Sequence, residues 1–102
     1  MKQHLFVGGL VAAGFDPAGR FLLTVSHAGR GIFSIGNWVR IARDSSRVYP
    51  ENGQIMGIGP LEGMLIPVVE HYDEPPFCFE SPDGTYAFEY EDGTITVTDG
   101  RA

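Results

Sequence analysis

The stretch ESPDGTYAFEYEDGTITV, residues 80–97, decides the fold of this chain. Asp92-Gly93 lies between two runs that alternate apolar and polar side chains, and such a pair favours the positive φ angles of a two-residue hairpin turn. Pairing across the turn places Phe88 opposite Val97 on an apolar face, while glutamates and threonines share the other face. A shift of one residue would destroy this match, so the sequence predicts an antiparallel hairpin in this register.

Similar patterns predict β-strands along the rest of the chain. Alternating runs form one antiparallel meander over residues 4–43 and a second over 64–99, and no segment has a helical period with caps. The connection 44–63 is rich in glycine, and we expect its QIMGI segment to add a short strand. Pro67 predicts an edge strand or a bulge where it occurs. Residues 1–102 are therefore expected to form a single all-β domain, with the two meanders packed as a sandwich or a partly open barrel.

Two turns of the same chemistry precede hairpins in both meanders. Pro17 and Gly19 align with Pro82 and Gly84, either as a weak internal repeat or as two uses of one favourable turn. The segments FDPAGRFLLTVSHAGRGIFSI and ESPDGTYAFEYEDGTITV resemble the inner hairpins of WD40-like β-propeller blades. A closed propeller needs about 4 to 8 blades, so the resemblance implies blade-like hairpins and no complete ring.

Composition is that of an ordinary globular protein, with 43% hydrophobic and 20% charged residues. The one cysteine, Cys78, has no partner for an internal disulfide, which favours a reducing compartment such as the cytoplasm. The apolar run from Leu5 to Phe15 follows a basic start and is either a buried first strand or a short secretory signal, and we favour the strand. No apolar run reaches the ~18 to 20 residues of a membrane span.

Charge is divided unevenly along the chain. Residues 1–61 hold six Lys or Arg against three Asp or Glu, whereas residues 62–102 hold one Arg against ten acids, within a net charge of −6. Such an acidic part repels nucleic acid and attracts a basic protein partner, although a solvated face that only keeps the protein soluble has the same composition.

The sequence contains no recognisable catalytic constellation. Ser34 has the wrong glycine spacing for a nucleophile elbow, and no phosphate-binding loop is present. The densest polar cluster is the 70–74 loop, which contains carboxylates and His71. These residues are consistent with a solvated loop. Together with the tip at His27 they are also consistent with a metal or acid–base site. We expect the solvated loop, hence no enzyme, no metal and no cofactor.

We therefore predict a non-enzymatic protein-binding module. In character, though in no diagnostic motif, the chain resembles the immunity proteins that occlude toxins in bacterial competition. Trp38, near Arg40 and Arg43, is either an aromatic anchor on the surface or a core residue. The alternative functions are a homo-oligomeric β module, for instance a homodimer, and a small enzyme or metal-binding domain that uses the 70–74 loop. The predicted partner-binding residues are Glu70, Asp73, Glu74, Glu89, Glu91, Asp92 and Trp38.

Overall fold

The computed structural model describes residues 2–46, 48–70 and 77–99, and these residues form β-strands and one short 3-10 helix. No helix among them is long and apolar enough to cross a membrane. The elements are β1 (Lys2–Phe6), β2 (Leu10–Phe15), β3 (Phe21–Ser26), β4 (Gly29–Ser34), β5 (Arg40–Asp44), β6 (Gln54–Met56), η1 (Gly59–Leu61), β7 (Leu65–Glu70), β8 (Phe77–Glu80), β9 (Tyr86–Glu91) and β10 (Thr94–Asp99).

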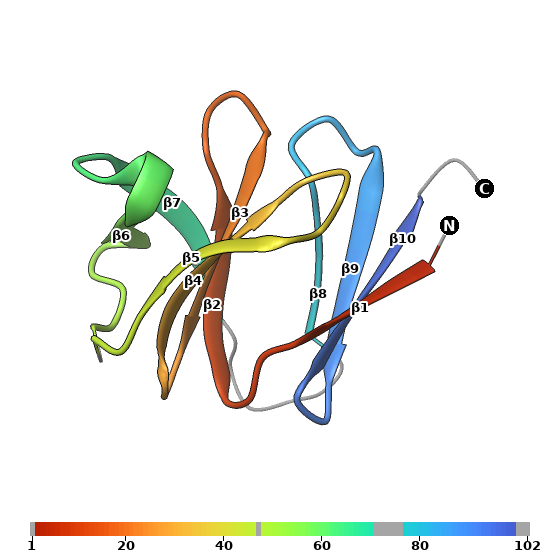
Figure 1. Cartoon of the computed structure of the whole chain (residues 1–102), viewed down its shortest axis with the longest axis horizontal. Coiled ribbons are helices and arrows are strands. Elements are labelled where there is room, and N and C mark those ends of the chain that lie inside the picture. The colour runs from red at the N-terminus through yellow and green to blue at the C-terminus, as the bar shows by residue number, and fades with distance from the viewer. Residues whose placement is uncertain (1, 47, 71–76, 100–102) are drawn as a thin grey trace.

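Two antiparallel sheets face each other (Figure 1). The four-stranded sheet has the order β1-β10-β9-β8, and the six-stranded sheet has the order β5-β4-β3-β2-β7-β6. The six-stranded sheet curls, because η1 returns to β5: a Cβ on Gly59 would stand 2.6 Å from the Cβ of Ala42. The predicted all-β sandwich or partly open barrel is confirmed.

The sheets exchange one strand each relative to the predicted meanders over 4–43 and 64–99. β1 joins the C-terminal sheet, where Leu5 pairs with Ile95, and β7 joins the N-terminal sheet beside β2. The cause is a turn inside the apolar run, where Gly9 has a φ of 68° and redirects the chain. What the sequence presents as one strand is therefore two strands in different sheets.

The predicted hairpin of β9 and β10 is confirmed in its register. Phe88 lies opposite Val97, and both side chains are buried, whereas Glu89 between Phe88 and Tyr90 is exposed. Asp92 and Gly93 have φ angles of 52° and 78°, as the turn requires.

The connecting segment also contains the expected short strand, β6. It pairs with the first half of β7, through Leu65–Pro67, while the second half of β7 pairs with β2. The sequence predicts an edge strand or a bulge at Pro67, but β7 is an internal strand with no register shift in either ladder, and Pro67 lies where its partner changes. At that changeover the missing N–H of Pro67 does not interrupt the β2 ladder, which starts at Val68.

The core lies on both faces of the six-stranded sheet. One apolar cluster fills the space between the two sheets, and the other lies beneath the curl formed by β6, η1 and β7. This is why β3 is buried at almost every position instead of at alternate ones. Phe88 is central to the first cluster: its ring stacks on Phe79 at 4.9 Å and contacts Phe15 and Trp38 at 5.4 and 5.8 Å.

Candidate functional site

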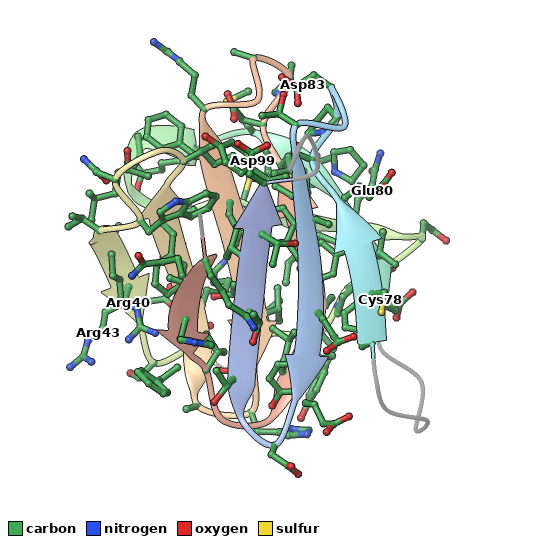
Figure 2. All side chains as sticks on the ribbon, turned by 90° about the vertical axis from the view of Figure 1, so that its right-hand side faces the viewer. Arg40, Arg43, Cys78, Glu80, Asp83 and Asp99 are labelled. Atoms are coloured by element: carbon green, nitrogen blue, oxygen red, sulfur yellow. The ribbon has the colours of Figure 1, made fainter. Side chains whose placement is uncertain are left out.

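The outer face of the four-stranded sheet carries the acids of the C-terminal hairpin. Because directly paired residues share a face, the registers place Glu80 beside Ala87, Cys78 beside Glu89, and Glu91 beside Thr94. Figure 2 views this face, with Cys78 and Glu80 labelled. We call the outward side chains of β8, β9 and β10 the acidic face: Cys78, Glu80, Ala87, Glu89, Glu91, Thr94, Thr96 and Thr98.

Few interactions within the described residues engage the carboxylates of the acidic face. The one contact to Glu89 is long, 4.0 Å from Cys78 Sγ to Glu89 Oε2, and the one ion pair between described residues lies in the other sheet. Beyond β10, the edge strand β1 adds Lys2, His4 and Phe6, and His4 Nδ1 lies 3.3 Å from Thr96 Oγ1. The arrangement is a surface with carboxylates on one side and an exposed aromatic ring on the other, and a hollow of about 520 Å³ lies among Lys2, Cys78, Glu80 and Glu89.

The predicted binding residues are only partly gathered there. Glu89, Glu91 and Asp92 share one hairpin and are all exposed. Glu70 is half-buried at the end of β7, opposite Ala12 in the six-stranded sheet. Asp73 and Glu74 lie outside the described residues.

The alternative site on the 70–74 loop also falls mostly outside the described residues. His71, Asp73 and Glu74 are not described, and no group of three or more potential metal ligands exists among the residues that are. The His27 tip has a different partner: His27 Nδ1 lies 3.2 Å from the Tyr49 hydroxyl. The metal or acid–base function therefore stays the alternative to the expected solvated loop.

Trp38 lies in the core, with 6% of its surface exposed. Its ring packs edge-on against Tyr86 at 5.1 Å, and its buried Nε1 has no hydrogen-bond partner among the described residues. The loop between β4 and β5 spans residues 35–39, and within it Trp38 N donates to Ser34 O and the φ of Trp38 is 61°. This backbone turns the indole inward, so Trp38 is not the exposed anchor that the sequence prediction required.

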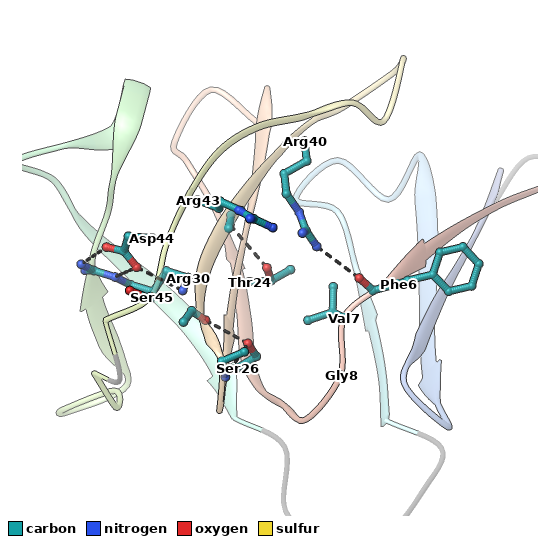
Figure 3. Close-up of a pocket in the computed structure, with 13 residues that line it drawn as sticks. Phe6, Val7, Gly8, Thr24, Ser26, Arg30, Arg40, Arg43, Asp44 and Ser45 are labelled. Carbon is teal, nitrogen blue, oxygen red and sulfur yellow. Dashed lines mark hydrogen bonds and ion pairs between the residues drawn. The ribbon is translucent and has the colours of Figure 1, made fainter.

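A second candidate site, missed by the sequence reasoning, is a groove of about 490 Å³ at one corner of the sandwich. Its floor is made by Thr24, Ser26, Gly29 and Gly31 of β3 and β4, all buried. One wall is the β1–β2 turn and the other is β5, which supplies Arg40 and Arg43 (Figure 3). We call this the arginine groove. Nothing in the sequence spacing of the two arginines indicates that they share a face.

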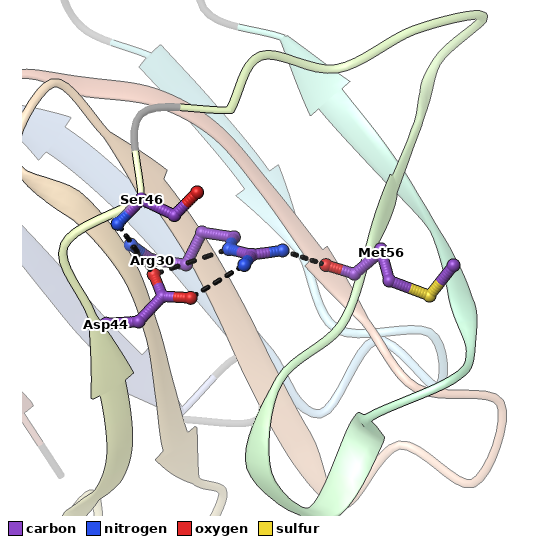
Figure 4. Close-up of polar contacts among 4 residues, drawn as sticks. All are labelled: Arg30, Asp44, Ser46 and Met56. Atoms are coloured by element: carbon purple, nitrogen blue, oxygen red, sulfur yellow. Dashed lines mark hydrogen bonds and ion pairs between the residues drawn. The ribbon is translucent and has the colours of Figure 1, made fainter.

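Arg30 and Asp44, which also line the arginine groove, form a clamp that joins β4, β5 and β6 (Figure 4). Arg30 Nη2 donates to Asp44 Oδ2 at 2.6 Å, and Arg30 Nη1 donates to the carbonyl of Met56 at 2.8 Å. The backbone N–H groups of Arg30 and Ser46 also donate to Asp44 Oδ1. Burial raises the pKa of Asp44, but the hydrogen bonds from Arg30 and Ser46 and the charge of Arg30 outweigh it and hold the pKa below its ordinary value.

Comparisons with known proteins give no match: no protein-family model, no curated protein and no solved structure matches this chain.

Proposed function

We propose that the protein is a non-enzymatic binding module that docks its acidic face against a basic region of another protein. The observation that carries the proposal is the outward projection of Glu80, Glu89 and Glu91 from adjacent strands, with no ion-pair partner among the described residues. Asp92 adds a fourth exposed acid at the hairpin tip. An immunity or inhibitor protein that occludes a basic toxin site has this kind of surface.

Electrostatic complementarity and an apolar anchor have different roles in such docking. The carboxylates steer a basic partner into contact and so raise the association rate, whereas buried aromatic contacts slow dissociation. Because Trp38 is in the core, Phe6 is the aromatic residue that suits the anchor. Its side chain is 74% exposed and is aligned with Thr94 and Glu91 across the sheet. The same proposal places the protein in the cytoplasm, where the exposed Cys78 stays reduced.

The proposal is tested with a partner captured from the native lysate at low salt, identified by mass spectrometry and then purified. Association kinetics are measured for wild type, for Glu89→Lys with Glu91→Lys, and for Glu51→Lys with Glu62→Lys, which makes the same charge change elsewhere. Glu51 and Glu62 are exposed and adjoin β6 and η1 of the other sheet. We expect the acidic-face variant to associate about tenfold more slowly with a weaker salt dependence, and the control to resemble wild type.

Equal slowing of both variants would show that only net charge matters and would reject the acidic face as the docking surface. Phe6→Ala tests the anchor separately, since it should raise the dissociation rate and leave the association rate and its salt dependence unchanged.

Self-association is a second candidate function, favoured by exposed apolar side chains at the edge strand β6 and beside it. Met56, Leu65 and Tyr49 are 43%, 59% and 55% exposed, and an edge strand offers unpaired backbone groups to a second copy. A mass in solution of 11.1 kDa across micromolar concentrations would exclude it, whereas twice that mass, lost on Met56→Lys, would support it.

A further inference from the structure

The arginine groove brings together two cations that the sequence spacing would separate. Residues three apart on a regular strand point to opposite faces. On β5, however, Arg43 pairs with Gly31 and Arg40 pairs with Phe33, so Ile41 is an extra residue at a β-bulge. Since Gly31 and Phe33 share a face of β4, the bulge places both guanidiniums on the inner face of the six-stranded sheet. Figure 3 shows both side chains directed into the groove.

The inner face becomes small and polar at this corner. Leu22 and Phe33 belong to the core between the sheets, but further along β3 the inward residues are Thr24 and Ser26, opposite Gly31 and Gly29. A Cβ on Gly31 would stand 3.2 Å from Thr24 Oγ1 and 3.6 Å from Arg40 Nε, so a larger residue would fill the space under the guanidinium. Glycine therefore keeps the floor of the groove open below the arginines.

The charges in the groove do not cancel. Arg30 and Asp44 neutralise each other in the clamp, at 2.6 Å. Arg40 is held by a hydrogen bond from its Nη2 to the carbonyl of Phe6, at 3.1 Å, and lies 4.9 Å above the ring of Phe33. Neither Arg40 nor Arg43 has an ion-pair partner among the described residues. The groove thus has two uncompensated positive charges, one of them held in a fixed orientation, in a protein whose net charge is −6.

We propose that the arginine groove binds a small organic molecule through its oxyanion, a phosphate or a carboxylate. Guanidinium groups donate paired hydrogen bonds to such oxyanions, and their positive charge strengthens those bonds. The groove volume of about 490 Å³ is in the range of small-molecule sites and exceeds what the anionic group alone occupies. The open floor accommodates the body of the molecule, and the hydroxyls of Thr24 and Ser26 line it.

The test is a titration of the ¹⁵N-labelled protein with inorganic phosphate and, separately, with acetate, followed by the amide resonances of Gly8, Gly29, Gly31 and Ser45. Sodium chloride at matched ionic strength is the control for screening. We expect saturable shifts confined to these groove residues. Saturation by phosphate alone identifies a phosphate ligand, and saturation by acetate alone identifies a carboxylate. Saturation by both supports a general oxyanion site.

Three variants relate the shifts to the arginines. Arg43→Gln removes a side chain with no hydrogen bond or ion pair to another described residue, so the fold should be retained while the dissociation constant rises about tenfold. Arg40→Gln should have at least the same effect. Arg20→Gln is the matched control, because Arg20 also lies over an aromatic ring, 5.8 Å from Phe21, but outside the groove.

The proposal is overturned if neither anion gives saturable shifts beyond those of chloride. It is also overturned if Arg20→Gln weakens binding as much as Arg43→Gln and Arg40→Gln do, since binding would then reflect only diffuse surface charge.

Discussion

Breaking the Arg30–Asp44 clamp should destabilise the fold, by an amount that depends on which of the two residues is replaced. Arg30→Met removes the ion pair and also the hydrogen bond to the Met56 carbonyl, which ties β6 to β4. Asp44→Asn removes the negative charge, but its side-chain oxygen can still accept from the backbone N–H groups of Arg30 and Ser46. The arginine variant should therefore be the less stable of the two.

The magnitude follows from the exposure of the two side chains. An exposed ion pair contributes ~0.2–1 kcal/mol, and breaking a buried one costs ~3–5 kcal/mol. The side chain of Arg30 is 12% exposed and that of Asp44 is 34% exposed, so this pair is intermediate. We expect a coupling free energy of about 1–2 kcal/mol, with losses of about 2–3 kcal/mol for Arg30→Met and about 1 kcal/mol for Asp44→Asn.

The measurement is urea unfolding of wild type, both single variants and the double variant, followed by far-ultraviolet circular dichroism. Unchanged m-values would show that the variants unfold as the wild type does. The reasoning is refuted by a coupling below about 0.3 kcal/mol, or by a loss for Asp44→Asn as large as that for Arg30→Met.

Asp44→Asn should also change how the stability of the protein depends on pH. The pKa of Asp44 is lower in the folded protein than its ordinary value of 3.8, so its stabilisation is fully present above that value and is lost as the pH falls through the lowered pKa. Wild type should lose more stability than Asp44→Asn between about pH 5 and about pH 2. Parallel pH profiles for the two proteins would contradict this assignment.

Two further predictions concern the packing of the strands. Gly29→Ala would place a Cβ 2.0 Å from the carbonyl oxygen of Asp44 at a φ of 135°, and should lower the free energy of unfolding by about 3 kcal/mol or more. Gly19→Ala, at a φ of 68° in open space, is the control and should lower it by about 1 kcal/mol. Equal losses for the two variants in urea unfolding would contradict the close approach of β4 to β5. Tyr90→Phe removes the hydroxyl that accepts a hydrogen bond from the buried Leu10 N–H at 3.1 Å, and should lower the free energy of unfolding by ~1–3 kcal/mol in the same assay. Tyr49→Phe removes a hydroxyl on the surface, and its free energy of unfolding should stay within ~0.5 kcal/mol of wild type.

The parts of the fold that the sequence predicts are those set by neighbouring residues. The β9–β10 register follows from local alternation and from the Asp92-Gly93 turn. The two Pro-containing turns also share their hydrogen bonds: Gly19 N donates to Asp16 O, and Gly84 N donates to Ser81 O. This equivalence is local, and either explanation of the repeat accounts for it.

The parts that the sequence misses depend on distant contacts. The transfer of β1 to the C-terminal sheet requires the pairing of Leu5 with Ile95, and the transfer of β7 requires the pairing of Val69 with Ala13, which is likewise far away in the sequence. The arginine groove depends on one extra residue, Ile41, because a regular strand would have pointed Arg40 and Arg43 to opposite faces. The sequence alone leaves Trp38 either as a surface anchor or as a core residue, and the backbone of the β4–β5 loop places it in the core.

The position of Trp38 also makes its fluorescence an intrinsic probe of contact between the two sheets. It is the only tryptophan of the chain, it belongs to the loop that joins two strands of the six-stranded sheet, and it contacts Tyr86 and Phe88 of the other sheet. Its emission wavelength therefore depends on whether the two sheets are in contact, whereas circular dichroism depends on whether the strands exist. Comparing the two signals during refolding would show whether the sheets form before they dock or only as they dock.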